Sequence, residues 1–423
     1  MRRALLALAL LTVAALPVSA HAAADPYVVV LKDSAATSSA TQLEQRLGFR
    51  SGAHYRAALK GFAARLSDTQ ARRLRADPAV DFVARDVVMH SAGTPVAAGE
   101  NVQPGVRRIG AVTAASGAHG AADSSVAVLD TGVDLANADL NAVSGVNCIT
   151  RGALAKDDNG HGTHVAGIVG ARNNGAGVLG VAPGTRIVSV KVLNARSSGT
   201  LSQILCGIDW VTANAAAQNI RVANMSIAGA GANDGNCGNT NNDAEHRAIC
   251  RASAAGVTFV ASAGNAKSDF AKSIPAAYPE VLTVTGMSDS DGAAGGVGSA
   301  IKCVRGEADD RYAAYSNWAG SAGARAHAIA APGTCVVSVR NGGGTATYNG
   351  TSQAAPHVAG AAALCLGSGG VAGPCAGLAP PGVVAKLRAD AAAHDSLATG
   401  FFGDPLRPYG TRHYGALAYA GGY

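Results

Sequence analysis

The sequence predicts an α/β fold with a mostly parallel central sheet, and three observations lead to this class. From about residue 126 onward, short apolar runs rich in β-branched residues alternate with helical segments. Glycine supplies 54 of the 423 residues, and 48% of the residues are hydrophobic although few are aromatic, which is typical of a tightly packed interior. Polar residues follow several of the apolar runs, and parallel sheets gather their chemistry at the carboxyl ends of strands.

Five apolar runs are expected to form strands of this sheet. Each is short, continuous and bounded by turn residues, as in strands that are buried on both faces. They are 126–129, 186–192, 222–227, 257–262 and 281–284. A later stretch, Ala355 to Leu366, is apolar and rich in alanine, and its length predicts a buried helix.

Residues 1–24 have the composition of a secretory signal peptide. Met1-Arg2-Arg3 precedes an apolar run that ends at Val18, and small residues follow up to Ala24. The apolar run is too short to span a membrane comfortably, and no other stretch approaches 20 apolar residues. We therefore expect cleavage near Ala22 to Ala24, export to the medium or the periplasm, and no stable membrane span.

Residues 25–92 predict a small, separate α+β module of the ferredoxin-like kind. Strand and helix patterns alternate in the order 27–31, 38–47, 61–66, 67–75 and 80–83. Ser67 and Gln70 form a capping box at the start of the second helix.

The rest of the chain is divided by composition. Residues 93–104 are rich in Gly, Ala and Pro without periodicity and predict a linker, which is a natural place for proteolysis. Residues 105–400 are expected to form one large domain. Residues 401–423 are rich in Gly and Tyr, and we assign no role to this tail from the sequence.

The eight cysteines all follow the signal peptide, and an even number in an exported chain favours disulfides over a metal site. Spacing favours two pairs, Cys237 with Cys250 and Cys365 with Cys375. The other four allow three pairings, and the sequence does not choose among them: Cys148, Cys206, Cys303 and Cys335. The net charge of +6 is small for this length and includes no basic run, so nucleic acid is not an expected partner.

Four polar residues stand where an activated serine nucleophile would be assembled. Asp130 ends a buried strand, and His161 begins a helix rich in small residues. Ser352 lies at the start of the predicted helix, where free backbone N–H groups and the helix dipole stabilise an oxyanion. Asn265 follows a later strand and could donate from its amide to the same oxyanion. Taken singly, Asp130 could be a strand-end cap and His161 a core histidine.

The segments around these four residues, in this order, resemble the subtilisin family of serine proteases, and residues 60–63 and 79–83 resemble its inhibitor-type propeptide. The resemblance implies the subtilisin-like three-layer fold, a cut near 91–93, and an Asp130, His161 and Ser352 triad with Asn265 in the oxyanion hole. It also implies that the propeptide acts as an intramolecular inhibitor and folding aid. We expect a monomer that cleaves proteins and peptides.

The same resemblance implies a substrate cleft. Small or glycine-containing segments would pair with the peptide backbone. Leu201, Ile204 and Ile227 would form an apolar pocket for a side chain a few residues before the cut. The full set expected at the substrate is Ser197, Ser198, Gly199, Leu201, Ile204, Ser226, Ile227, Ala228, Gly229 and Gly264. The primary pocket shows no evident charge at its matching positions, so a neutral or hydrophobic side chain is favoured there.

A structural calcium site also follows from the resemblance. Hard oxygen ligands with few charges suit Ca²⁺. They would come from the Asp139 carboxylate, the Asn174 side chain, the carbonyls of Arg172, Ala176 and Val178, and Glu100. The alternative is a plain surface turn.

Two other functions stay open at this stage. A binding or inhibitory protein on the same fold would have lost turnover, although all four catalytic positions are filled. An esterase of another α/β fold would carry a G-x-S-x-G elbow, whereas Gly350 and Ala354 flank Ser352. One departure from the family is Gln353, which stands where many subtilisins carry Met.

Overall fold

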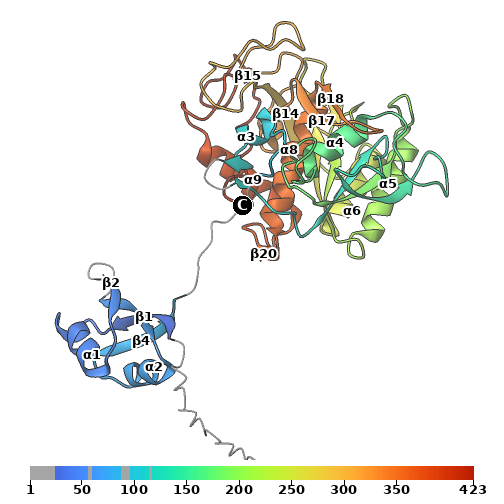
Figure 1. Ribbon diagram of the computed structural model, residues 1–423. Coiled ribbons are helices and arrows are strands. Elements are labelled where there is room, and N and C mark those ends of the chain that lie inside the picture. Colours follow the sequence, from blue (N-terminus) through green and yellow to red (C-terminus); the bar gives the residue numbers. More distant parts are fainter. Residues whose placement is uncertain (1–23, 56–59, 87–95, 114–116) are drawn as a thin grey trace, which may run out of the picture. The chain divides into compact units, whose positions relative to one another are not determined.

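The computed structural model describes residues 24–55, 60–86, 96–113 and 117–423. The chain divides into two compact units, one within residues 1–91 and one within residues 92–423 (Figure 1). The signal peptide and the expected cut near 91–93 lie outside the described residues, so both stay predictions.

The smaller unit is an antiparallel sheet in the order β2-β3-β1-β4 with two helices. Its elements are β1 (Asp25–Leu31), α1 (Ser39–Leu47), β2 (Ser51–Tyr55), β3 (Gly61–Leu66), α2 (Asp68–Arg75) and β4 (Val80–Arg85). The expected capping box is present: the Ser67 Oγ accepts the Gln70 N–H at 3.3 Å, and the Gln70 Oε1 accepts the Ser67 N–H at 2.8 Å. Strand β2 was not predicted.

A mostly parallel sheet forms the centre of the larger unit. Its order is β15-β14-β12-β10-β7-β9-β8, and β16 also pairs with β14. The pairing of β14 with β15 is antiparallel, and the other pairs are parallel. The strands are β7 (Ser125–Asp130), β8 (Asn141–Asn147), β9 (Arg186–Lys191), β10 (Ile220–Met225), β12 (Thr258–Ser262), β14 (Val281–Ser288), β15 (Arg311–Tyr312) and β16 (Ala328–Pro332).

Helices cover both faces of this sheet (Figure 1). On β7, Val126 and Val128 face a core that includes α4 and α8, whereas Ala127 and Leu129 face a second core with α5 and α6. The expected three layers follow from this alternation. The helices are α3 (Pro104–Arg108), α4 (His161–Gly170), α5 (Leu201–Asn214), α6 (Ala244–Ala254), α7 (Ala322–Arg325), α8 (Thr351–Leu366), α9 (Pro380–His394) and the 3-10 helix η1 (Phe270–Lys272).

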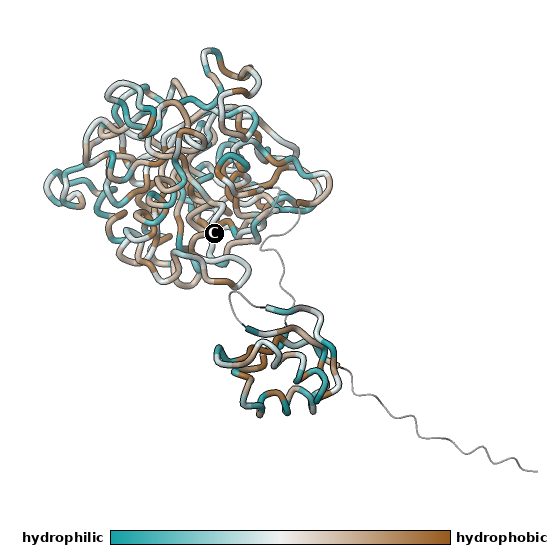
Figure 2. Tube along the Cα trace, turned by 90° about the vertical axis from the view of Figure 1, so that its left-hand side faces the viewer, coloured by the Kyte–Doolittle hydropathy of each residue, from teal (hydrophilic) through white to brown (hydrophobic). Residues whose placement is uncertain are grey.

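Short strands complete the larger unit. They pair as hairpins or local bridges outside the central sheet. They are β5 (Val112–Thr113), β6 (Gly117–Ala118), β11 (Gly229–Ala230), β13 (Ser273–Ile274), β17 (Val336–Val339), β18 (Thr345–Tyr348), β19 (Gly367–Ser368) and β20 (Val371–Ala372). In Figure 2 hydrophobic stretches run through the interior of both units.

The tail from residue 401 packs into the core of the larger unit. Phe401 and Tyr414 are buried there. Backbone hydrogen bonds join Ala330 N–H to Ala416 O at 2.9 Å and Ala418 N–H to Ala330 O at 2.8 Å. This segment therefore extends the edge at β16 and belongs structurally to the larger unit.

All eight cysteines form disulfides. The two pairs that spacing favours are present, Cys237 with Cys250 and Cys365 with Cys375. Of the three open pairings, the structure has Cys148 with Cys206 and Cys303 with Cys335.

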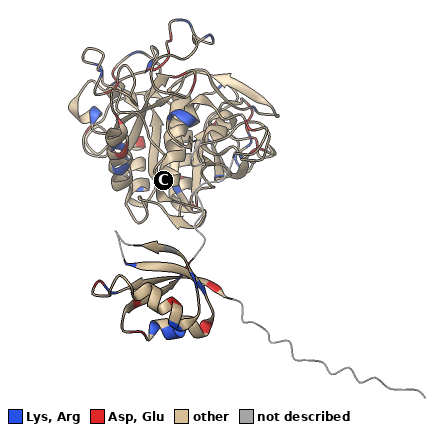
Figure 3. Cartoon of the chain, turned by 60° about the vertical axis from the view of Figure 1, so that its left-hand side comes forward, with Lys and Arg blue, Asp and Glu red and all other residues tan. Residues whose placement is uncertain are grey.

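Charged residues are scattered over both units, as Figure 3 shows, and the long helix α8 carries none. The helices of the described part of the chain are all too short or too polar to cross a bilayer.

Candidate active site

The first two expected catalytic residues lie in contact at the carboxyl edge of the sheet. Asp130 ends β7 and is fully buried, and His161 is the first residue of α4. The His161 Nδ1 lies 2.8 Å from the Asp130 Oδ1. Gly162 lets α4 approach so closely, because a Cβ there would lie 2.1 Å from the Gly132 carbonyl oxygen.

The environment of His161 favours its protonated form. Burial lowers the pKa of the imidazole, but the charge of Asp130, its hydrogen bond and the charge of Asp157 outweigh burial and raise that pKa above its ordinary value. The ring is one-fifth exposed, so it is open to a substrate on one side. A carboxylate that holds Nδ1 leaves Nε2 to exchange a proton with another group.

Ser352 is the second residue of α8, as the sequence predicts. Its hydroxyl donates to the carbonyl oxygen of Ser226 at 3.3 Å. Among the described residues, no hydrogen bond joins Ser352 to His161, although both side chains line one cavity. Of the expected triad, the contact between Asp130 and His161 is therefore present. The Ser352 hydroxyl is hydrogen-bonded to Ser226 and not to His161.

Asn265 presents its amide nitrogen to that cavity. Its Oδ1 accepts the backbone N–H of Thr351 at 2.9 Å and the Thr351 hydroxyl at 3.0 Å. Because Thr351 holds the Asn265 side-chain oxygen, the Nδ2 group on the other end of the amide is left to donate toward the cavity that Asn265 lines.

The cavity has a volume of about 630 Å³ and contains every residue expected to contact substrate. His161, Asn265 and Ser352 line it as well. The expected residues found in it are Ser197, Ser198, Gly199, Leu201, Ile204, Ser226, Ile227, Ala228, Gly229 and Gly264. The residues expected to act as nucleophile, base and amide donor therefore share one cleft with the residues expected to hold a peptide.

Comparison with known proteins decides the family. The profile of the subtilase family matches residues 121–369, which is more than half of the chain. The chain belongs to the subtilase family. The peptidase inhibitor I9 profile matches residues 26–92, so this subtilase carries an inhibitor-type propeptide domain and is a zymogen.

Relatives of this subtilase cover most of its length. Subtilisin E of Bacillus subtilis (strain 168) is 34% identical over 308 residues, covering 72% of this chain and 70% of that protein. Proteinase R of Parengyodontium album is 31% identical over 351 residues, covering 81% and 79%. The crystal structure of a cold adapted subtilisin-like serine proteinase matches with a TM-score of 0.54 and 28% identity, covering 76% of this chain and 99% of that one. The subtilase is a serine endopeptidase.

The loop expected to bind calcium brings two carboxylates together. The Glu100 Oε1 accepts the N–H groups of Asn174, at 2.6 Å, and of Gly175, at 2.7 Å. The Asp139 Oδ1 accepts the Asn174 side-chain amide at 3.1 Å. Burial and the charge of Glu100 raise the pKa of Asp139, and among the described residues the buried Glu100 Oε2 has no partner. The donor set of this subtilase loop fits a hard cation.

Two other histidines of the subtilase are packing residues. His164 is fully buried, its Nε2 lies 3.1 Å from the carbonyl oxygen of Val336, and its ring stacks on Tyr348. Burial lowers the pKa of His164 to about 4. The His357 Nδ1 lies 2.9 Å from the Gln353 carbonyl oxygen within the same helix.

Sequence reasoning missed five residues of the cavity lining, which are Leu193, Ala230, Glu245, Ile274 and Pro275. Glu245 is the only acidic residue in this lining. It lies in the first turn of α6, where an acidic residue is explained by the helix dipole. No local pattern connects it to the cleft, because only the packing of α6 brings it there.

Proposed function

We propose that the subtilase cleaves peptide bonds through Ser352, His161 and Asp130. Ser352 Oγ attacks the peptide carbonyl and passes its proton to His161 Nε2, which returns it to the leaving amine. Asp130 orients the imidazole through Nδ1 and stabilises its charged form. Water then hydrolyses the acyl-enzyme by the same route.

The observation that carries this proposal is the 2.8 Å contact of His161 with Asp130 beside a cleft that Ser352 also lines. The serine must turn from the Ser226 carbonyl toward the imidazole. Rotation about one side-chain bond of Ser352 would break only its 3.3 Å hydrogen bond to the Ser226 carbonyl oxygen. Catalytic hydrogen bonds commonly tighten when substrate binds, so this difference is compatible with catalysis.

The oxyanion would be held by two donors. The Ser352 backbone N–H lies in the first turn of α8 and has no intrahelical acceptor. The Asn265 Nδ2 faces the same cavity because Thr351 holds the amide oxygen. Two oriented donors in a partly dry site stabilise the charge that develops on the carbonyl oxygen.

Substrate would bind as an extended peptide along the cleft. The segments 197–199 and 226–229 consist of small residues apart from Ile227, which allows backbone hydrogen bonding to a peptide. Leu201, Ile204 and Ile227 supply apolar surface for a side chain upstream of the cut.

The proposal includes export and self-processing. The four disulfides are compatible with an oxidising destination. The module at residues 25–92 would assist folding, inhibit the enzyme through its C-terminal segment and be removed by the enzyme, which then acts as a monomer.

Calcium is proposed as a structural ligand of the 172–178 loop. Asp139 and the unpartnered Glu100 oxygen would supply charge, and Asn174 and the loop carbonyls of Arg172, Ala176 and Val178 would supply neutral oxygens. The ion would cancel the repulsion between the two carboxylates and tie the loop to the start of the mature domain.

A fluorophosphonate label tests the proposal directly. The full chain, expressed for export and allowed to process, should be labelled and should cleave peptides, and Ser352→Ala should do neither and should remain unprocessed. An unlabelled wild type would favour a binding protein without turnover. Turnover of simple esters with no cleavage of peptides would favour an esterase.

A further inference from the structure

Glu245 is a buried acid in a cleft whose other lining residues are mostly apolar or small. It is the second residue of α6, is only 5% exposed and lines the cavity that contains Ser352. Among the described residues, no group hydrogen-bonds to its carboxyl or forms an ion pair with it; its backbone N–H is capped by Asp243. Neither carboxyl oxygen is among the fully buried atoms that lack a partner, so the carboxyl is open to the cavity and can pair with a group of a ligand that binds there.

The packing of α6 places this carboxyl toward the upstream part of the cleft. Helices α5 and α6 pack on each other, and both follow parallel strands, so their first turns lie at the same edge of the sheet. The first turn of α5 carries Leu201 and Ile204. These residues and Ile227 form the apolar pocket expected for a side chain a few residues before the cut, and Glu245 is the acid beside it.

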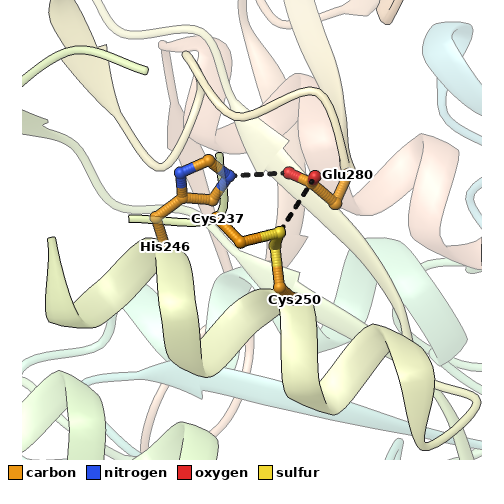
Figure 4. A group of neighbouring side chains, drawn as sticks. All are labelled: Cys237, His246, Cys250 and Glu280. Atoms are coloured by element: carbon orange, nitrogen blue, oxygen red, sulfur yellow. Dashed lines mark hydrogen bonds and ion pairs between the residues drawn. A yellow bond between two sulfur atoms is a disulfide. The ribbon is translucent and has the colours of Figure 1, made fainter. Parts of the chain in front are cut away.

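Nearby titratable groups leave a surplus of negative charge. His246 lies between Asp234, at 3.3 Å, and Glu280, at 2.8 Å, and Figure 4 shows its ring turned toward Glu280. The hydrogen bond to Glu280 and the charges of Glu280, Asp234 and Asp243 outweigh burial and raise the pKa of His246. Its ring stacks on Tyr278, whose hydroxyl donates to Asp243 at 2.7 Å.

The His246 imidazole therefore stands among the carboxyl groups of Asp234, Asp243 and Glu280, and Asp243 also acts on Glu245. Helix α6 itself adds two cations, Arg247 and Arg251, and both are exposed outside the cavity lining. The sulfurs of Cys237 and Cys250 in this region are joined to each other, so they offer no thiolate to a metal ion (Figure 4). Helix α5 adds only Asp209, which is exposed, and the segments 226–230 and 274–275 add no titratable side chain. No cation of the cavity lining neutralises Glu245, since His161 is its only basic residue and is paired with Asp130.

We propose that Glu245 is a specificity-determining residue that selects a Lys or Arg side chain in the pocket formed by Leu201, Ile204 and Ile227. This rests on the proposed peptidase function and names its substrate class. The aliphatic stem of a Lys or Arg packs on the three apolar residues while the charged head reaches the carboxylate. An apolar side chain would instead seal the carboxyl away from water without a partner.

The selection depends on pH. Burial, and then the charge of Asp243, raise the pKa of Glu245 to about 7. Below that pH the carboxyl is neutral and tolerates an apolar side chain. Above it the carboxylate favours a cation, so the preference for Lys or Arg increases as the pH rises through about 7.

The experiment compares peptides that differ only by Lys or norleucine at each of the four positions before the cut. Values of kcat/KM are measured at pH 6 and pH 8.5, per active site titrated with a fluorophosphonate. At one upstream position, wild type should favour Lys on the order of 10-fold at pH 8.5 and less at pH 6. Glu245→Gln should abolish the preference at both pH values, Glu245→Asp should retain part of it, and Asp209→Asn, an equal charge change outside the cavity, should retain all of it.

The results separate this inference from the function on which it rests. A wild type that is labelled and cleaves peptides without a Lys preference, or a Glu245→Gln enzyme that retains the preference, overturns the role of Glu245 alone. A preference confined to the residue directly before the cut overturns its assignment to the Leu201 pocket. A wild type that is neither labelled nor active overturns both. If Glu245→Gln gives no labelled enzyme, the role of Glu245 is tested by the pH dependence of the Lys preference in the wild type and in Glu245→Asp. A preference that does not change with pH in either enzyme overturns that role.

Discussion

The Thr351 hydroxyl donates to the Asn265 side-chain oxygen at 3.0 Å while it accepts the backbone N–H of Gly264 at 3.0 Å. It therefore joins the start of α8 to the end of the β12 segment. Thr351, the residue next to Ser352, thus fixes which end of the Asn265 amide faces the cleft.

Replacing Asn265 should remove a donor that acts mainly in the transition state. We expect Asn265→Ala to lower kcat roughly 10²- to 10³-fold with a small change in KM. Steady-state kinetics on a peptide substrate would measure this. A rise in KM of the same size with kcat unchanged would mean that Asn265 binds the substrate ground state, which contradicts its proposed role.

Thr351 should matter through its hydroxyl. Thr351→Val keeps the shape but removes both hydrogen bonds and frees the Asn265 amide to turn, so kcat should fall while Thr351→Ser stays near wild type. The buried Gly264 N–H loses its acceptor, which should cost about 1–3 kcal/mol of the free energy of unfolding. Paired kinetics and denaturant unfolding would check both effects, and a fully active Thr351→Val enzyme would refute them.

The contact of Asp130 with His161 should set the acid limb of the pH profile. His161 accepts a proton only when it is neutral, and its pKa is raised, so kcat/KM should fall with decreasing pH around a pKa higher than that of an ordinary histidine. Asp130→Asn should lower kcat roughly 10⁴-fold and move this limb to lower pH, because the anion that raises the pKa is gone. An unmoved limb in the variant would assign the titration to another group.

Calcium should stabilise the folded enzyme if the 172–178 loop binds it. At a free calcium concentration of 100 times Kd, the gain is about 2.7 kcal/mol, which corresponds to several degrees in Tm for a domain of this size. Calorimetry with calcium and with chelator would measure the shift in wild type, in Asp139→Asn and in the surface control Asp209→Asn. We expect the shift to vanish only in Asp139→Asn, and an unchanged wild-type Tm would contradict the site.

Gln353 should protect the active site from oxidation. It is buried beside Ser352, and the two methionines of the described residues, Met225 and Met287, are both fully buried. Mild peroxide should therefore leave activity intact, whereas Gln353→Met should lose activity as its thioether becomes a polar sulfoxide. Residual activity after timed peroxide exposure tests this, and rapid loss in wild type would show that another group is oxidised.

Local patterns account for what the sequence predicted well. Buried strands such as β7 and the capping box of Ser67 depend on residues that are close together in the sequence, so they can be predicted without knowledge of the fold. Strand β8 was missed because NAVSGVN mixes polar residues and glycine and is half-buried along most of its length. Strand β16 is built largely of alanine, which has no strong strand preference.

Long-range packing accounts for what was missed. The Cys148–Cys206 pair joins residues 58 apart, and no local spacing distinguishes it from two alternatives. Glu245 reaches the cleft only because α6 packs on α5. The direction of the Ser352 hydroxyl depends on the Ser226 carbonyl, a group from another strand.

The tail beyond residue 400 should be essential for folding of the larger unit. Its backbone pairs with Ala330 on both sides of residue 417, and the Ala420 N–H donates to the Ile109 carbonyl at 2.7 Å, which joins the end of the chain to α3. Deleting residues 401–423 removes these bonds and uncovers core residues packed against Phe401 and Tyr414, so we expect little folded, processed enzyme. Deleting only Gly422 and Tyr423 is the matched control, because it keeps every one of these contacts. Yield of processed enzyme and Tm would be compared, and a stable, active enzyme without residues 401–423 would show that β16 holds its edge of the sheet unaided.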